Sequence, residues 1–85
     1  MFNKIINREK IVKEVNSNKI ITIVNSRQEE IGILLYDNAY SIGKDDYEEL
    51  RFSFNDSKLG YFFKINFKNI LMYDTKKNQL IIKAI

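Results

Sequence analysis

Apolar and polar residues alternate most clearly over residues 50–67, and this pattern predicts an antiparallel hairpin. Side chains of an extended strand alternate between its two faces, so each arm gathers its large apolar residues on one side. A turn at residues 56–59 gives the register that brings most of these apolar residues together. A shift of the register by one residue would place the apolar side chains of one strand on the solvent-facing side. The inward pairs of this register are Leu50 with Ile65, Phe52 with Phe63, and Phe54 with Tyr61.

Residues 3–15 have apolar positions at helical spacing and predict an N-terminal helix. Asn3 is of the type that caps a helix, and Glu9 and Lys13 have the four-residue spacing of helix-surface ion pairs. A hairpin that pairs the end of this segment with residues 20–24 is the alternative. The helix is preferred because the apolar residues of the segment do not alternate cleanly.

The rest of the chain predicts short strands, because β-branched and alternating apolar residues recur between turn residues. Gly32 predicts a bulge or a sharp bend. We expect one α+β domain over residues 1–85, mainly antiparallel, with the helix on a strongly bent sheet or in a small barrel. The strands resemble in order and length those of Sm-like or SH3-like small barrels, a likeness of pattern that carries over no functional residue. The expected strands are residues 19–25, 29–36, 39–43, 49–55, 60–67, 70–74 and 79–84, the last two forming a hairpin.

Composition is that of a small globular domain. Of 85 residues, 45% are hydrophobic and 29% are charged, which is too apolar a balance for disorder. The apolar runs are far shorter than the roughly 18 residues of a membrane helix, and the N-terminus has no signal-peptide pattern. We therefore expect a cytoplasmic protein that binds no membrane. Many residues with AT-rich codons favour a low-GC bacterium or its phage.

Side chains suited to catalysis are scarce. The chain has no histidine and no cysteine, which removes the commonest general base, a common nucleophile, disulfides and zinc–thiolate sites. The acidic residues 45–49 lack the spacing and the turn glycine of a calcium loop, and they are typical of a solvated loop. We therefore predict no enzyme activity, no cofactor and no metal site.

The outward face of the central hairpin carries a candidate binding patch. In the predicted register Arg51 lies opposite Lys64, and like charges directly opposite each other destabilise a sheet. Cations that follow phosphates beside a ring that stacks on a base are typical of single-stranded nucleic-acid binders. The alternative is that Phe62 lies beneath the helix and that the charges are merely solvated, since the net charge is only +3. The residues of this hairpin patch are Arg51, Phe62, Lys64, Asn66 and Lys68.

A second candidate surface is aromatic. Tyr36, Tyr40 and Tyr73 are expected near strand ends, where an amphipathic ring favours an interface. Surplus apolar residues, Leu34, Ile81 and Ile85 among them, would leave an exposed patch of the kind that marks partner or homo-oligomer contacts. The alternative is that both faces of the bent sheet are covered.

Three functions remain open from the sequence. The preferred one is a non-enzymatic protein that occupies the surface of a protein partner, because catalytic residues are lacking. A phage or mobile-element inhibitor of a host defence protein is one instance. The second is a small nucleic-acid-binding barrel that uses the hairpin patch. The third is a homo-oligomer that sequesters an anionic signalling nucleotide.

Overall fold

The computed structural model describes residues 4–54 and 62–84. This part of the chain has the predicted α+β class, with one α-helix and mostly antiparallel strands, and its strands from β2 onward fall within or close to the predicted ranges. The elements in chain order are β1 (Lys4–Ile5), α1 (Arg8–Asn18), β2 (Ile20–Asn25), β3 (Glu30–Leu35), β4 (Asn38–Ile42), the 3-10 helix η1 (Lys44–Asp46), β5 (Glu49–Ser53), β6 (Phe62–Asn66), the 3-10 helix η2 (Phe67–Asn69), β7 (Ile70–Asp74) and β8 (Gln79–Ile82).

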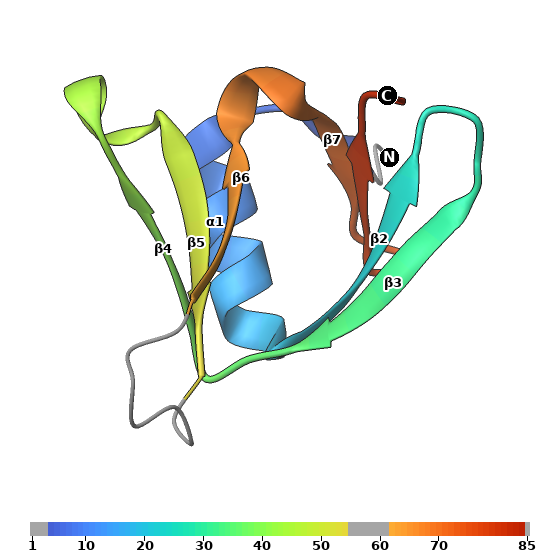
Figure 1. Ribbon diagram of the computed structural model, residues 1–85, viewed down its shortest axis with the longest axis horizontal. Helices are drawn as coiled ribbons and strands as arrows, with labels where there is room; N and C mark the ends of the chain where they lie inside the picture. The colour runs from blue at the N-terminus through green and yellow to red at the C-terminus, as the bar shows by residue number, and fades with distance from the viewer. Residues whose placement is uncertain (1–3, 55–61, 85) are drawn as a thin grey trace.

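The strands form two sheets on either side of a shared interior (Figure 1). Sheet A has the order β1-β7-β8-β2-β3, and sheet B has the order β4-β5-β6. Neighbouring strands are antiparallel except for β2 and β8, which are parallel. Among the described residues no strand pair joins the two sheets, so a closed barrel is not found there.

The N-terminal helix is present, but it begins and ends later than residues 3–15. Asn7 caps it, because the Asn7 side-chain oxygen accepts the amide N–H of Lys10 at 3.1 Å. Asn3, the expected cap, lies outside the described residues. The chain before the cap forms β1 instead, because Ile5 pairs with β7 and packs against the core. Such a pairing is a long-range contact that local spacing does not reveal.

The central hairpin has the predicted register. The rings of Phe52 and Phe63 lie on the same side of the sheet with their centroids 6.1 Å apart. The expected turn over residues 56–59 lies outside the described residues, and so does the predicted partner of Phe54, Tyr61. The aligned pairs are Leu50 with Ile65, Arg51 with Lys64, Phe52 with Phe63, and Ser53 with Phe62. Alternation thus predicted this pairing residue by residue.

One core fills the space between the two sheets and α1. Phe52 of sheet B contacts the ring of Tyr36 edge-on, with the ring centroids 4.8 Å apart. The Tyr36 hydroxyl donates to the carbonyl oxygen of Val15 in α1 at 2.6 Å. Among the residues with no exposure or almost none are Ile11, Val15, Ile21, Leu50, Phe52, Tyr73 and Leu80. Because each sheet gives only its inward face to this core, each also has an outer face.

Candidate interaction surfaces

The outer face of sheet A is apolar along β2 and β3. Ile20 pairs with Leu35 and Thr22 with Ile33, so these four side chains share one face. Ile33 and Leu35 are 62% and 68% exposed, and Ile31, two residues before Ile33, is 58% exposed. Ile20 is 42% exposed. We call Ile20, Ile31, Ile33 and Leu35 the aliphatic patch.

Sequence reasoning expected surplus apolar residues at the surface and named Leu34, Ile81 and Ile85, of which Ile85 lies outside the described residues. Leu34 is half-buried and packs against the core, and Ile81 is half-buried. The register between β2 and β3 shifts where Val24 pairs with Glu30 and Ile23 pairs with Gly32. This irregularity confirms the bulge predicted around Gly32. The signal for the aliphatic patch was present, because β3 carries apolar residues on both of its faces.

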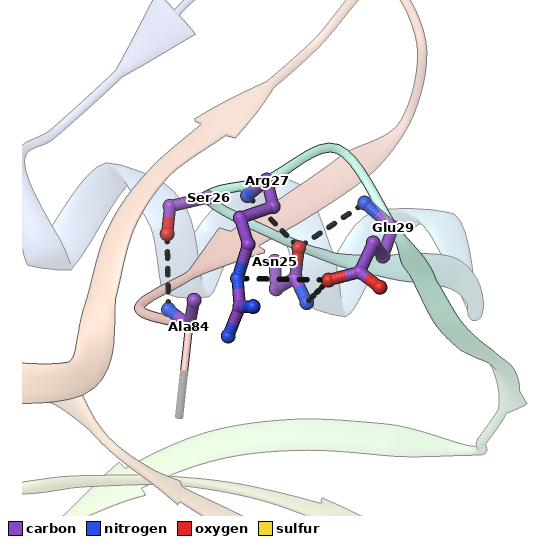
Figure 2. A network of polar contacts seen from close by, with 5 residues as sticks. All are labelled: Asn25, Ser26, Arg27, Glu29 and Ala84. Carbon is purple, nitrogen blue, oxygen red and sulfur yellow. Dashed lines mark hydrogen bonds and ion pairs between the residues drawn. The ribbon is translucent and has the colours of Figure 1, made fainter.

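A network of polar contacts holds the turn between β2 and β3 (Figure 2). Asn25 is 8% exposed, and its Oδ1 accepts the amide N–H groups of Arg27 at 2.9 Å and Glu29 at 3.1 Å. The Asn25 Nδ2 donates to the Glu29 carboxylate at 3.0 Å, and Arg27 Nε lies 3.7 Å from the same carboxylate. Ser26 Oγ accepts the amide N–H of Ala84 at 3.0 Å. The network therefore fixes the start of β3 against β2 and β8.

A hollow of about 490 Å³ lies beside this turn on the outer face of sheet A. Met72 and Ile81 contribute apolar surface to it, while Lys4 and Lys77 contribute positive charge. Asp74 also lines the hollow, but its Oδ1 accepts the amide N–H groups of residues 76 and 77 at 3.0 and 3.2 Å. Since this carboxylate is engaged in its own turn, the hollow is suited to contact and offers no evident chemistry.

The outer face of sheet B carries ion pairs instead. Arg51 lies opposite Lys64, as predicted. Glu49 reaches both, since its carboxylate lies 2.9 Å from Arg51 Nη2 and 3.5 Å from Lys64 Nζ. The hydrogen bond from Arg51 lowers the pKa of the Glu49 carboxyl, and the Lys64 charge lowers it further. The same hydrogen bond raises the pKa of Arg51. Glu49 therefore offsets part of the positive charge of the hairpin patch.

The structure brings together only part of the hairpin patch. Asn66 lies opposite Glu49, and its Oδ1 accepts the amide N–H of Lys68 at 3.0 Å. Lys68 is exposed, but it lies in η2 beyond the end of β6. Phe62 has its backbone in β6 opposite Ser53, while its side chain lies outside the described residues. Glu49 was missed, although its position two residues before Arg51 put it on the same face.

Two of the three tyrosines that were expected at the surface are core residues. Tyr36 is 5% exposed and Tyr73 is 1% exposed. The Tyr73 hydroxyl donates to Asn78 Oδ1 at 2.6 Å, and desolvation by burial raises the pKa of both tyrosines. Each ring packs in the interior, and its hydroxyl forms a hydrogen bond. A tyrosine can be buried in this way because its ring is apolar and its hydroxyl is polar. Tyr40 is half-buried on the outer face of sheet B, so an aromatic surface would depend on Tyr40 alone.

Within residues 45–49, Glu48 is engaged locally and the backbone of Tyr47 is held by the helix. The Glu48 carboxylate accepts the amide N–H of Lys44 at 3.2 Å, and Arg8 donates to the carbonyl oxygen of Tyr47 at 2.7 Å. Residues 4–54 and 62–84 contain no group of three or more side chains that could hold a metal ion.

Comparison with known proteins adds no assignment, because no family model, curated protein or solved structure matches the chain. In the described part of the chain, no helix is long and apolar enough to cross a membrane. The surfaces are therefore compared by their geometry and chemistry.

Proposed function

We propose that this protein is a non-enzymatic binding module that occupies the surface of a protein partner with the outer face of sheet A. The observation that carries this proposal is the aliphatic patch, whose four large side chains are between 42% and 68% exposed on one sheet. Contiguous exposed apolar surface on a folded domain is typical of interaction sites. The scarcity of catalytic side chains supports a binding role over an enzymatic one.

The aliphatic patch supplies a useful share of a binding free energy. Complete burial of an isoleucine or leucine stabilises by about 1.5–3 kcal/mol, and roughly half of that remains available at these positions. Four such side chains then contribute roughly 4 kcal/mol before the costs of association are subtracted. The patch is therefore suited to the centre of an interface that extends over the neighbouring hollow.

The partner that fits this face presents apolar side chains to the aliphatic patch. Beside the hollow it presents polar groups of both charges, because Lys4, Lys77 and Glu30 all line it. A host defence protein bound by a phage or mobile-element inhibitor in the bacterial cytoplasm is one such partner. Support for that instance comes only from the AT-rich codon composition and the lack of catalytic residues.

The test is capture from a bacterial lysate with matched variants. Ile33→Asp and Leu35→Asp place a charge in the aliphatic patch at exposed positions, so the fold tolerates them. Lys64→Glu is the control, because it changes a charge on the outer face of sheet B. We expect wild-type protein and the control to retain one stoichiometric protein that both patch variants lose. Equal capture by all four, or no stoichiometric partner, contradicts the proposal.

A second candidate is a small nucleic-acid-binding barrel of Sm-like or SH3-like type. Arg51 opposite Lys64 on an outer face favours it, and Glu49 between them weakens it. Phosphate binding at this site predicts that Glu49→Gln raises the affinity for a single-stranded oligonucleotide. It also predicts that affinity falls steeply between 50 and 200 mM salt, because counterions are released on binding. Fluorescence anisotropy that shows no binding, or binding independent of salt, removes this candidate.

A further inference from the structure

Strand β3 has an open hydrogen-bonding edge in the described part of the chain. It is the last strand of sheet A. The Tyr36 amide donates to the Lys19 carbonyl oxygen at 3.1 Å, which directs it toward the β2 side. Because successive residues of a strand direct their N–H and C=O groups to opposite sides, Leu35 and Ile33 direct theirs away from β2. These groups therefore line the outer edge of sheet A.

This edge has little of the protection that natural edge strands carry. Proteins usually blunt an edge with charged residues, proline, a bulge or a very short strand, because an open edge is a template for a second strand. β3 has six residues, and its charged residue is Glu30 at the first position. The register irregularity leaves Ile31 without an aligned residue on β2, so the regular edge runs from Gly32 to Leu35 and includes Ile33.

We propose that β3 pairs with β3 of a second copy of this chain, antiparallel about a twofold axis at Ile33. Sheet A would then continue across the axis into a sheet of both copies. The pairing uses the backbone edge of β3, whereas the proposed partner binding uses its outer face, so one molecule can do both. In this register Ile33 lies opposite the partner's Ile33, Leu35 opposite the partner's Ile31, and Gly32 opposite the partner's Leu34.

In this register the side chains that would face each other across the pairing are compatible in size. On the outer face it joins the aliphatic patches of the two copies, so that Ile33 and Leu35 each gain an apolar neighbour. On the inner face it sets Leu34 beside a glycine of the partner. No heavy atom lies within 4 Å of a Cβ atom built on Gly32, so there is room at Gly32 for the larger side chain. A large residue opposite a small one packs without strain.

Charge along the paired residues does not oppose the approach of a second copy. The paired residues 31–35 have no ionisable side chain, so a second copy meets no like charge along them. At each end of the pairing Glu29 would approach the partner's Asp37. The Glu29 charge is already offset, since its carboxylate lies 3.7 Å from Arg27 Nε and accepts a hydrogen bond from Asn25.

The size of the contact predicts a weak and reversible dimer. One pair of short strands buries less than the roughly 800 Å² per partner of a standard interface. We therefore expect a dimer dissociation constant on the order of micromolar or larger, and a dimer fraction that rises with protein concentration. The aliphatic patches stay accessible in this dimer, because edge pairing leaves the sheet faces open.

The first test introduces single cysteines. The wild-type chain has no cysteine, so any disulfide must form at the introduced position. In a hydrogen-bonded antiparallel pair the two Cα atoms are about 5.5 Å apart, a separation that a disulfide spans. We expect diamide to link the Ile33→Cys variant into a covalent dimer at about 100 µM protein. Ile20→Cys is the matched control on the same face, because its copies would be three strand spacings apart across the sheet and four residues apart along it, a separation of about 20 Å. Equally fast linkage of the control overturns the proposal.

The second test is sedimentation velocity of the cysteine-free protein between about 10 and 500 µM. We expect the sedimentation coefficient of wild-type protein to rise with concentration toward that of a dimer. Ile33→Lys sets two like charges opposite each other, so it should keep the monomer value throughout. Its thermal unfolding should stay close to that of wild type, because the side chain it replaces is 62% exposed. A wild-type protein that remains monomeric over the whole range shows the proposal to be wrong.

Discussion

The outer faces of the two sheets differ in chemistry, although their inner faces share one core. On sheet A, Ile33 and Leu35 are more than 60% exposed. On sheet B, Glu49 joins Arg51 and Lys64 through ion pairs. In both sheets successive side chains point to opposite faces. The inner side chains must be apolar to form the core, whereas the outer side chains can differ in chemistry. Apolar area left uncovered thus distinguishes sheet A as the candidate surface, whereas polar groups on sheet B largely satisfy one another.

The largest expected effect tests the shared core. Phe52→Ala removes a ring with no exposure and should lower the free energy of unfolding by about 3–5 kcal/mol. Phe63→Ala removes the ring opposite, which is 41% exposed, and should cost about 1 kcal/mol. Urea denaturation of both variants measures the difference. Similar losses would contradict the difference in burial between the two rings of sheet B.

The next effect concerns a hydroxyl that links this core to α1. Tyr36→Phe removes the donor to the Val15 carbonyl oxygen and should cost about 1–2 kcal/mol. Burial raises the pKa of Tyr36, so its contribution to stability is complete below its ordinary value of 10.0. That contribution is lost as the pH rises above this value. Unfolding curves should therefore show a steeper alkaline loss above pH 10 for wild type than for the variant.

A smaller effect tests the ion pairs of sheet B. Glu49→Gln should destabilise less than Tyr36→Phe, because solvent at the sheet surface screens these ion pairs. The pKa of Glu49 is lowered from 4.5, so its contribution is present above that pH and is lost as the pH falls through the lower value. Thermal unfolding between pH 7 and pH 3 should show a smaller acid loss in the variant. An equal acid loss in both proteins would contradict a stabilising role for Glu49.

The smallest effect on stability is expected in the aliphatic patch. Ile33→Thr should change the free energy of unfolding by no more than about 0.5 kcal/mol, because the side chain is mostly exposed. It should also weaken the binding of a hydrophobic dye. Ile21→Thr is the matched control on the inner face, where exposure is 0%, and it should cost more than about 2 kcal/mol. Similar losses at both positions would remove the distinction between the two faces of sheet A.

The candidate surfaces were only partly predictable. The opposition of Arg51 and Lys64 followed from the alternation, but the role of Glu49 depends on side chains that reach across the sheet. Burial of Tyr36 and Tyr73 was not predicted, because an amphipathic ring suits a core or a surface equally well until its neighbours are known.

The sequence by itself determined the register of the central hairpin and the approximate bounds of the strands. Alternation is a local pattern, and a slip of one residue exposes every inward side chain, so no long-range information is needed. Only the tertiary structure decided that β1 pairs with β7, that β2 and β8 run parallel, and that Ile33 and Leu35 stay uncovered. A strand that is apolar on both faces leaves open which face the core takes, and contacts between distant segments make that choice.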